Sequence, residues 1–158
     1  MKMQKTGAQL TEADILGLGK QFEVRIPDDY KAFMLENNGG IPEEDWAFDF
    51  IVYGGEDPTS SVINYFHTIY PQEEGGYDSL RRAFSISRDE GYSPAWLIPI
   101  GSDPGGNIVF LDGSEEGNGK VLFGDHELED PETGYIIMSP IADSFTEFLD
   151  KLYIPTYE

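Results

Sequence analysis

Apolar residues recur at helical spacing in two stretches near the start of the chain. Thr11 is a good N-terminal cap, and Ile15 and Leu18 then lie on one face, which predicts a helix that two nearby glycines keep short. The second stretch, 27–38, begins with proline and two aspartates, which favour the first turn of a helix. The Asn-Gly-Gly sequence at 38–40 predicts its end.

Short β-branched and aromatic runs occupy the middle of the chain, where only one short helix, 79–84, is expected. The predicted strands are 46–53, 61–67, 96–100, 108–111, 120–123 and 135–138. Glycine-rich segments separate several of them, and Gly106 is expected to have a positive φ in the turn before the strand at 108. Pro99 predicts an edge or a bulge in its strand.

A last helix is predicted over 141–152, because apolar residues return to helical spacing there and charged residues fill the other face. Helices first, strands in the middle and one helix last predict an α+β fold. Its central sheet should be twisted and mainly antiparallel, flanked by N-terminal helices and a C-terminal helix, since the later strands are joined by tight connections. We expect a single domain over 1–158, with its core at about 11–153.

The chain is strongly acidic, with 30 acidic and 10 basic residues and a formal net charge of −20. Such a charge disfavours nucleic acid and anionic membranes and favours a cationic protein partner, although it can also serve solubility alone. There are no cysteines, so disulfides and thiolate metal sites are excluded. Without a signal-like or membrane-spanning apolar run, we expect a cytoplasmic protein.

No group of residues satisfies the pattern of a catalytic or metal site. His126 lies between Asp125 and Glu127, but the only other histidine is His67, and no zinc-binding motif is present. The acidic segments 112–119 and 127–132 lack the spacing of a calcium loop. We therefore predict a protein that is not an enzyme and has no catalytic residues, no metal and no cofactor.

Acidic residues on predicted loops, one group beside a tryptophan, are the candidates for binding a basic partner. Aromatic side chains supply anchors in interfaces, and charges steer association. The alternative for the tryptophan is a place in the core. The candidate residues are Glu43, Glu44, Asp45, Trp46, Glu56, Asp57, Glu73 and Glu74.

Four segments, taken in order, resemble the SMI1/KNR4 family, also called the SUKH superfamily. They are 26–40, with Ile-Pro-Asp-Asp-Tyr and Asn-Gly-Gly; 98–107, with Ile-Pro-Ile-Gly and Asp-Pro-Gly-Gly-Asn; 119–127, ending in Asp-His-Glu; and 141–149. Together they cover about 11–153, and the region 54–95 matches only loosely. The motif residues, which we interpret as structural, are Pro27, Tyr30, Gly39, Asp103, Gly105, Gly106, Asn107, Asp125, His126 and Phe145.

The resemblance implies an α+β domain that binds proteins and carries no family catalytic residues. The short chain resembles the bacterial members, which are immunity proteins that neutralise toxin domains, often nucleases. The corresponding hypothesis is an immunity protein that binds a cognate cationic toxin, such as a basic nuclease, through an acidic surface. The alternative is a non-enzymatic intracellular interaction or regulatory module unrelated to toxins.

Overall fold

The computed structural model describes residues 1–71, 75–116 and 119–156. Its helices are α1 (Glu12–Phe22), α2 (Asp28–Glu36), α3 (Leu80–Asp89) and α4 (Phe145–Lys151). Its strands are β1 (Met3–Gln4), β2 (Ile41–Pro42), β3 (Ala47–Ile51), β4 (Pro58–Val62), β5 (Tyr65–Phe66), β6 (Leu97–Ser102), β7 (Ile108–Asp112), β8 (Val121–Glu129) and β9 (Ile136–Ala142). The α+β prediction is confirmed.

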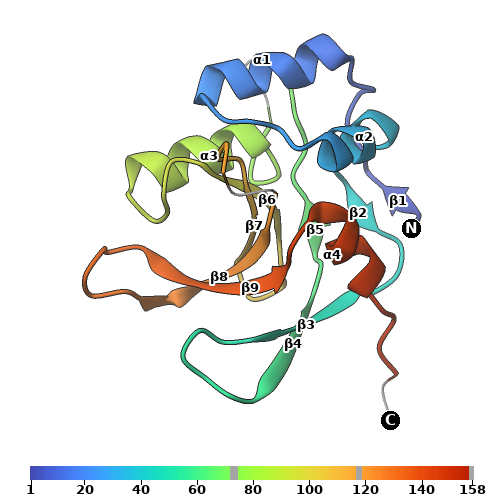
Figure 1. The fold of residues 1–158 in the computed structure, drawn as a ribbon. Helices are drawn as coiled ribbons and strands as arrows, with labels where there is room; N and C mark the ends of the chain where they lie inside the picture. The colour runs from blue at the N-terminus through green and yellow to red at the C-terminus, as the bar shows by residue number, and fades with distance from the viewer. Residues whose placement is uncertain (72–74, 117–118, 157–158) are drawn as a thin grey trace.

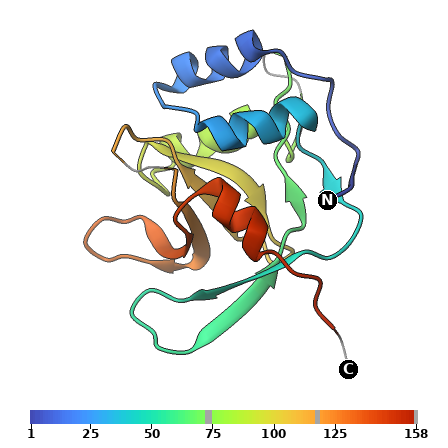
Figure 2. The same ribbon diagram turned by 45° about the vertical axis from the view of Figure 1, so that its right-hand side comes forward.

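A five-stranded antiparallel sheet with the order β5-β6-β7-β8-β9 forms the centre of the molecule. The strands β3 and β4 form a separate antiparallel hairpin, and β1 pairs with β2. Helices α1 and α2 lie at one end of the molecule, and the free ends of the β3–β4 and β8–β9 hairpins project together on one side (Figures 1 and 2). The two hairpins thus place two exposed loops on the same side of the molecule.

The five-stranded sheet buries apolar side chains on both faces. One face joins α1, α2, α3, α4 and β3 in the main core, which includes the stacked pairs Phe22–Phe84 and Phe50–Phe123. The other face forms a smaller cluster around Leu97, Phe110 and Ile136. Adjacent residues of β6 point to opposite faces, and all six are buried because each face is covered.

Helix α1 begins as expected but is longer than its glycines suggested. Thr11 caps its first turn and exchanges hydrogen bonds with Asp14, because the carboxylate of Asp14 accepts from the Thr11 backbone N–H. These hydrogen bonds lower the pKa of Asp14. The helix continues to Phe22, which is buried with Leu18 in the core, so tertiary packing outweighs the low helix propensity of glycine.

Helix α2 ends at Glu36, two residues before the predicted end. Asn37 is extended, and the positive φ values belong to Gly39 and Gly40. A Cβ built on Gly39 would lie 2.5 Å from the carbonyl oxygen of His67. Glycine is needed at 39 for its backbone conformation and because the chain passes so close to the segment before α3.

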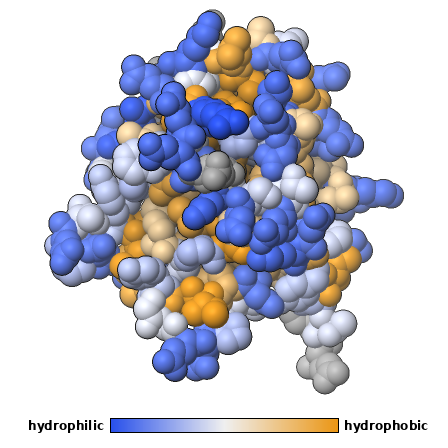
Figure 3. Space-filling view, viewed as in Figure 1, coloured by the Kyte–Doolittle hydropathy of each residue, from blue (hydrophilic) through white to orange (hydrophobic). Residues whose placement is uncertain are grey.

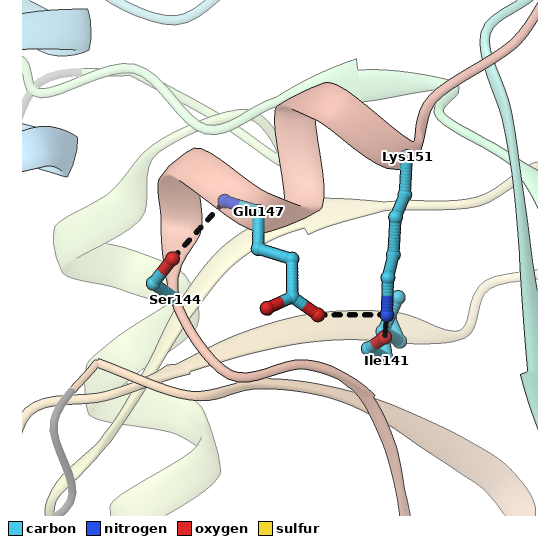
Figure 4. A network of polar contacts seen from close by, with 4 residues as sticks. All are labelled: Ile141, Ser144, Glu147 and Lys151. Atoms are coloured by element: carbon cyan, nitrogen blue, oxygen red, sulfur yellow. Dashed lines mark hydrogen bonds and ion pairs between the residues drawn. The ribbon is translucent and has the colours of Figure 1, made fainter.

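The last helix starts later than the periodicity predicted, because Ile141 and Ala142 belong to β9. Ala142 pairs with Val121 of β8 and is buried. Ser144 caps the helix by accepting the Glu147 backbone N–H at 3.0 Å (Figure 4). Lys151 then pairs with Glu147 at 2.8 Å, which lowers the pKa of that carboxyl, and donates to the Ile141 carbonyl (Figure 4).

Three more predictions are revised. The short helix at 79–84 extends to Asp89, since Phe84 and Ser87 continue its buried face. The strand expected at 61–67 is split into β4 and β5, which belong to different sheets. Pro99 lies in β6 between two neighbouring strands, and the register of β6 against β7 shifts between Pro99 and Gly101, so the bulge is confirmed and the edge is wrong.

Candidate functional site

The turn at 103–107 is built around the carboxylate of Asp103, which is only 6% exposed. Its Oδ1 accepts the backbone N–H groups of Gly105 at 3.0 Å and Asn107 at 2.8 Å. Its Oδ2 accepts the Asn107 side-chain amide at 3.1 Å and the Ser61 hydroxyl at 2.8 Å. Four donors occupy this carboxylate, so it joins the turn to the β3–β4 hairpin and is not free to bind a partner.

His126 extends this polar network through Asn107. Asn107 Oδ1 accepts from His126 Nδ1 at 2.6 Å and from the His126 backbone N–H at 3.1 Å. Asp125 accepts the backbone N–H of Glu127. Gly106 has φ 84°, as predicted, and a Cβ built there would lie 3.7 Å from Cε1 of His126. The sequence Asp-His-Glu is thus a strand segment tied to the neighbouring turn.

The remaining family-motif residues lie where helices begin or pack. Pro27 precedes the first residue of α2, and Tyr30 is buried one turn further on. The Tyr30 ring meets Phe145 of α4 edge-to-face at 5.2 Å between ring centroids. Burial raises the pKa of the Tyr30 hydroxyl. These contacts fasten α2 to α4.

The candidate loop 43–46 contains three exposed acids, Glu43, Glu44 and Asp45, and a half-buried tryptophan. Trp46 packs against the main core, which favours the structural alternative for most of its ring. It also lines a surface cavity of about 440 Å³ with the two glutamates and with Met1 and Lys2. The loop therefore combines an acidic edge with part of an aromatic side chain.

The candidates Glu56 and Asp57 are exposed at the other end of β3, in the loop of the β3–β4 hairpin. The five residues of β3 lie between them and the 43–46 loop, a span of about 16 Å. The structure does not bring these two groups into one site. Glu73 and Glu74 lie outside the described residues.

Acidic residues from the segment 127–132, together with the motif residue Asp125, line the second projecting hairpin. Asp125, Glu127, Glu129, Asp130 and Glu132 all lie on β8 or on the loop before β9, and the three glutamates are exposed. Figure 3 shows hydrophilic residues over both hairpin ends, with a small hydrophobic area between them. Together with Glu56 and Asp57, these residues form what we call the acidic hairpins. Sequence reasoning missed them because only the fold places the two loops on one side.

His67 is the only buried histidine, being 2% exposed. Its Nδ1 lies 2.6 Å from the carbonyl oxygen of Pro99, an atom that can only accept, so Nδ1 carries the proton. Burial lowers the pKa of His67 to about 4, partly offset by that hydrogen bond and by Asp78. The ring is therefore neutral at physiological pH.

Within 1–71, 75–116 and 119–156, no cluster of three or more histidine, cysteine, aspartate or glutamate side chains has the arrangement of a metal site. None of the helices in that part of the chain has the length and apolar character needed to span a membrane. What the described surface offers is exposed acids, aromatic side chains and shallow cavities, which suit contacts with another molecule.

The SMI1 / KNR4 family (SUKH-1) model matches residues 9–151. The chain belongs to this family, whose members are in general immunity proteins. It is 30% identical over 159 residues to the SPbeta prophage-derived uncharacterized protein YokK of Bacillus subtilis (strain 168). The alignment covers 93% of this chain and 74% of YokK. No solved structure matches.

Proposed function

We propose that this protein is an immunity protein that binds a cognate bacterial toxin domain, such as a basic nuclease, and blocks its activity. The observation that carries the proposal is membership of the SMI1/KNR4 family combined with a net charge of −20. The prophage origin in the name of the relative fits a gene that travels with a competition or defence system.

The acidic hairpins supply the electrostatic part of the mechanism. Their carboxylates are exposed on loops that project from the folded base, so they can approach a basic surface without deforming the core. Carboxylates attract the same cationic groups that a nuclease uses for phosphates, and they can raise the association rate 10- to 1,000-fold, as an order-of-magnitude estimate. Binding alone, without catalysis, would then keep the toxin from its substrate.

The experiment is co-expression with the toxin domain encoded by the adjacent open reading frame. Cells that produce the toxin should grow only when this protein is present, and the purified proteins should form a complex. Affinity should fall between about 0.05 and 0.3 M salt, because exposed charges are screened. An active toxin that is neither bound nor neutralised would contradict the proposal and favour an interaction module unrelated to toxins.

A further inference from the structure

A groove of about 380 Å³ lies between α3 and the open end of the five-stranded sheet, beside β5 and the 103–107 turn. Three tyrosines line it: Tyr65, Tyr77 and Tyr92. Tyr77 is 74% exposed and Tyr92 43% exposed, and the Tyr65 and Tyr77 rings meet edge-to-face at 5.4 Å. Large aromatic side chains left this accessible are typical of binding surfaces.

Polar groups without intramolecular partners also face this groove. Within the described part of the chain, the hydroxyl groups of Tyr65, Tyr77 and Tyr92 make no hydrogen bond. The buried His67 belongs to the lining, and its Nδ1 proton is committed to Pro99, so Nε2 carries a lone pair and has no partner among the described residues. The groove therefore contains hydrogen-bond acceptors as well as aromatic surface.

The groove lies next to the acidic β8–β9 hairpin. The backbone N–H of Ile136, the first residue of β9, donates to the Tyr92 carbonyl at 2.9 Å, and Ile136 pairs with Glu129. At the other end, Gly106 belongs to the lining and lies against His126, between Asp125 and Glu127. Asp89 and Glu90 at the end of α3 are exposed close in sequence to Tyr92. The segments that adjoin the groove thus carry acidic residues, while its described lining contains none.

We propose that this tyrosine groove is the docking site for a cationic segment of the partner protein. An arginine or lysine side chain of that segment packs against Tyr77 and Tyr92, and neighbouring basic residues lie along the carboxylates of the β8–β9 hairpin. The inference rests on the proposed function for the identity of the partner. Tyrosine rings attract cations through their faces, and the hairpin acids supply the complementary charge.

Arg82 makes the proposal sharply testable, because it is the only charged side chain among the described residues that line the groove. A cationic occupant is repelled by Arg82, whereas an anionic occupant such as a carboxylate would use it as the principal contact. Substitution R82Q should therefore tighten binding of a cationic segment, and the same substitution would abolish binding of an anionic one.

The first experiment uses a defined probe, an acetylated and amidated tetra-arginine peptide, titrated into the whole protein and followed by two-dimensional NMR. A tetra-citrulline peptide of nearly the same shape but no charge is the control. The expected result is that the arginine peptide alone shifts the resonances of Tyr77, Tyr92 and Ile108. Shifts confined to the loops at 43–46 and 56–57 would overturn the inference.

The second experiment measures peptide affinity for matched variants. Y77A and Y92A should each weaken binding about 3- to 10-fold, as expected for lost cation–π contacts, and R82Q should strengthen it. Y53A is the control, since Tyr53 is 73% exposed outside the groove, and should bind as the wild type does. Unchanged affinity in both groove variants, or weaker binding by R82Q, would contradict the proposal.

Repeating the affinity measurements with the toxin domain separates this inference from the proposed function. If the wild type and Y77A bind and neutralise the toxin equally well, the immunity function stands and the groove is not its docking site. If the groove binds the arginine peptide but the active toxin is neither bound nor neutralised, the cation groove stands and the immunity function fails.

Discussion

The 103–107 turn and the β8–β9 hairpin both contain acidic residues, one in the turn and several in the hairpin, yet their carboxylates lie in opposite environments. Asp103 in the turn is buried and accepts four hydrogen bonds. Glu127, Glu129 and Glu132 in the hairpin are exposed, and their side chains accept no hydrogen bond within the described residues. Acidity in the sequence therefore does not show whether a carboxylate is exposed; the number of internal hydrogen-bond donors around it decides that.

The largest expected effect is on the buried member of this comparison. D103A removes an acceptor for four donors, including two backbone N–H groups, and should lower the free energy of unfolding by about 3–4 kcal/mol. E129A is the matched control and should change it by less than about 0.5 kcal/mol. Urea unfolding measures both. Equal effects of the two substitutions would show that the buried Asp103 contributes no more to stability than the exposed Glu129.

The buried His67 predicts a specific pH dependence. Its folded-state pKa is lowered from 6.5 to about 4, so between these values the unfolded chain binds a proton that the folded protein does not. Stability from this residue is complete above about pH 6.5 and is lost as the pH falls toward 4, by up to about 3 kcal/mol.

The variant H67N isolates the pH-dependent contribution of His67 to stability, since asparagine can still donate to the Pro99 carbonyl but does not titrate. The free energy of unfolding of the wild type relative to H67N should fall between pH 7 and pH 4.5. Carboxylates titrate in both proteins and cancel in the difference. Parallel pH profiles of the two proteins would show that His67 is not held neutral by burial.

A smaller effect is expected for the backbone of the turn. Gly106 has φ 84°, and a Cβ there would make only an ordinary contact, 3.7 Å from Cε1 of His126, so G106V should cost about 2 kcal/mol, mainly through backbone strain. G106N should cost less, because asparagine tolerates the left-handed region better. The melting temperatures of the two variants test this. An unchanged value for G106V would contradict the strained-turn interpretation.

The smallest effect on stability is expected at the hairpin, where the effect on binding should be largest. The triple variant E127Q/E129Q/E132Q should change the free energy of unfolding by no more than about 0.5 kcal/mol per substitution, because no internal contact is lost. Its association with a basic partner should slow, and its salt dependence should weaken. A strongly destabilised variant would show that these glutamates, like Asp103, make internal contacts that stabilise the fold.

Local signals predicted much of the fold. The cap at Thr11, the Pro-Asp-Asp start of α2 and the glycine turn before β7 depend on residues within a few positions of one another, and all three formed where the sequence placed them. The start of the last helix was predicted too early because Ile141 and Ala142 fit helical spacing. In the structure both residues belong to β9, which pairs with β8. The sequence left open whether Pro99 lies at an edge or at a bulge, since the neighbours of a strand are not local information.

The sequence by itself determined the α+β class, the family and the acidic character of this protein, because these follow from residue order and composition. Only the tertiary structure decided which carboxylates accept internal hydrogen bonds and which remain exposed. It alone placed Tyr77, Tyr92 and the β8–β9 hairpin around one groove, from segments about 15 to 50 residues apart in the chain. The physical reason is that burial and hydrogen-bond partners are properties of the packed chain, so a carboxylate and its donors need not be neighbours in sequence.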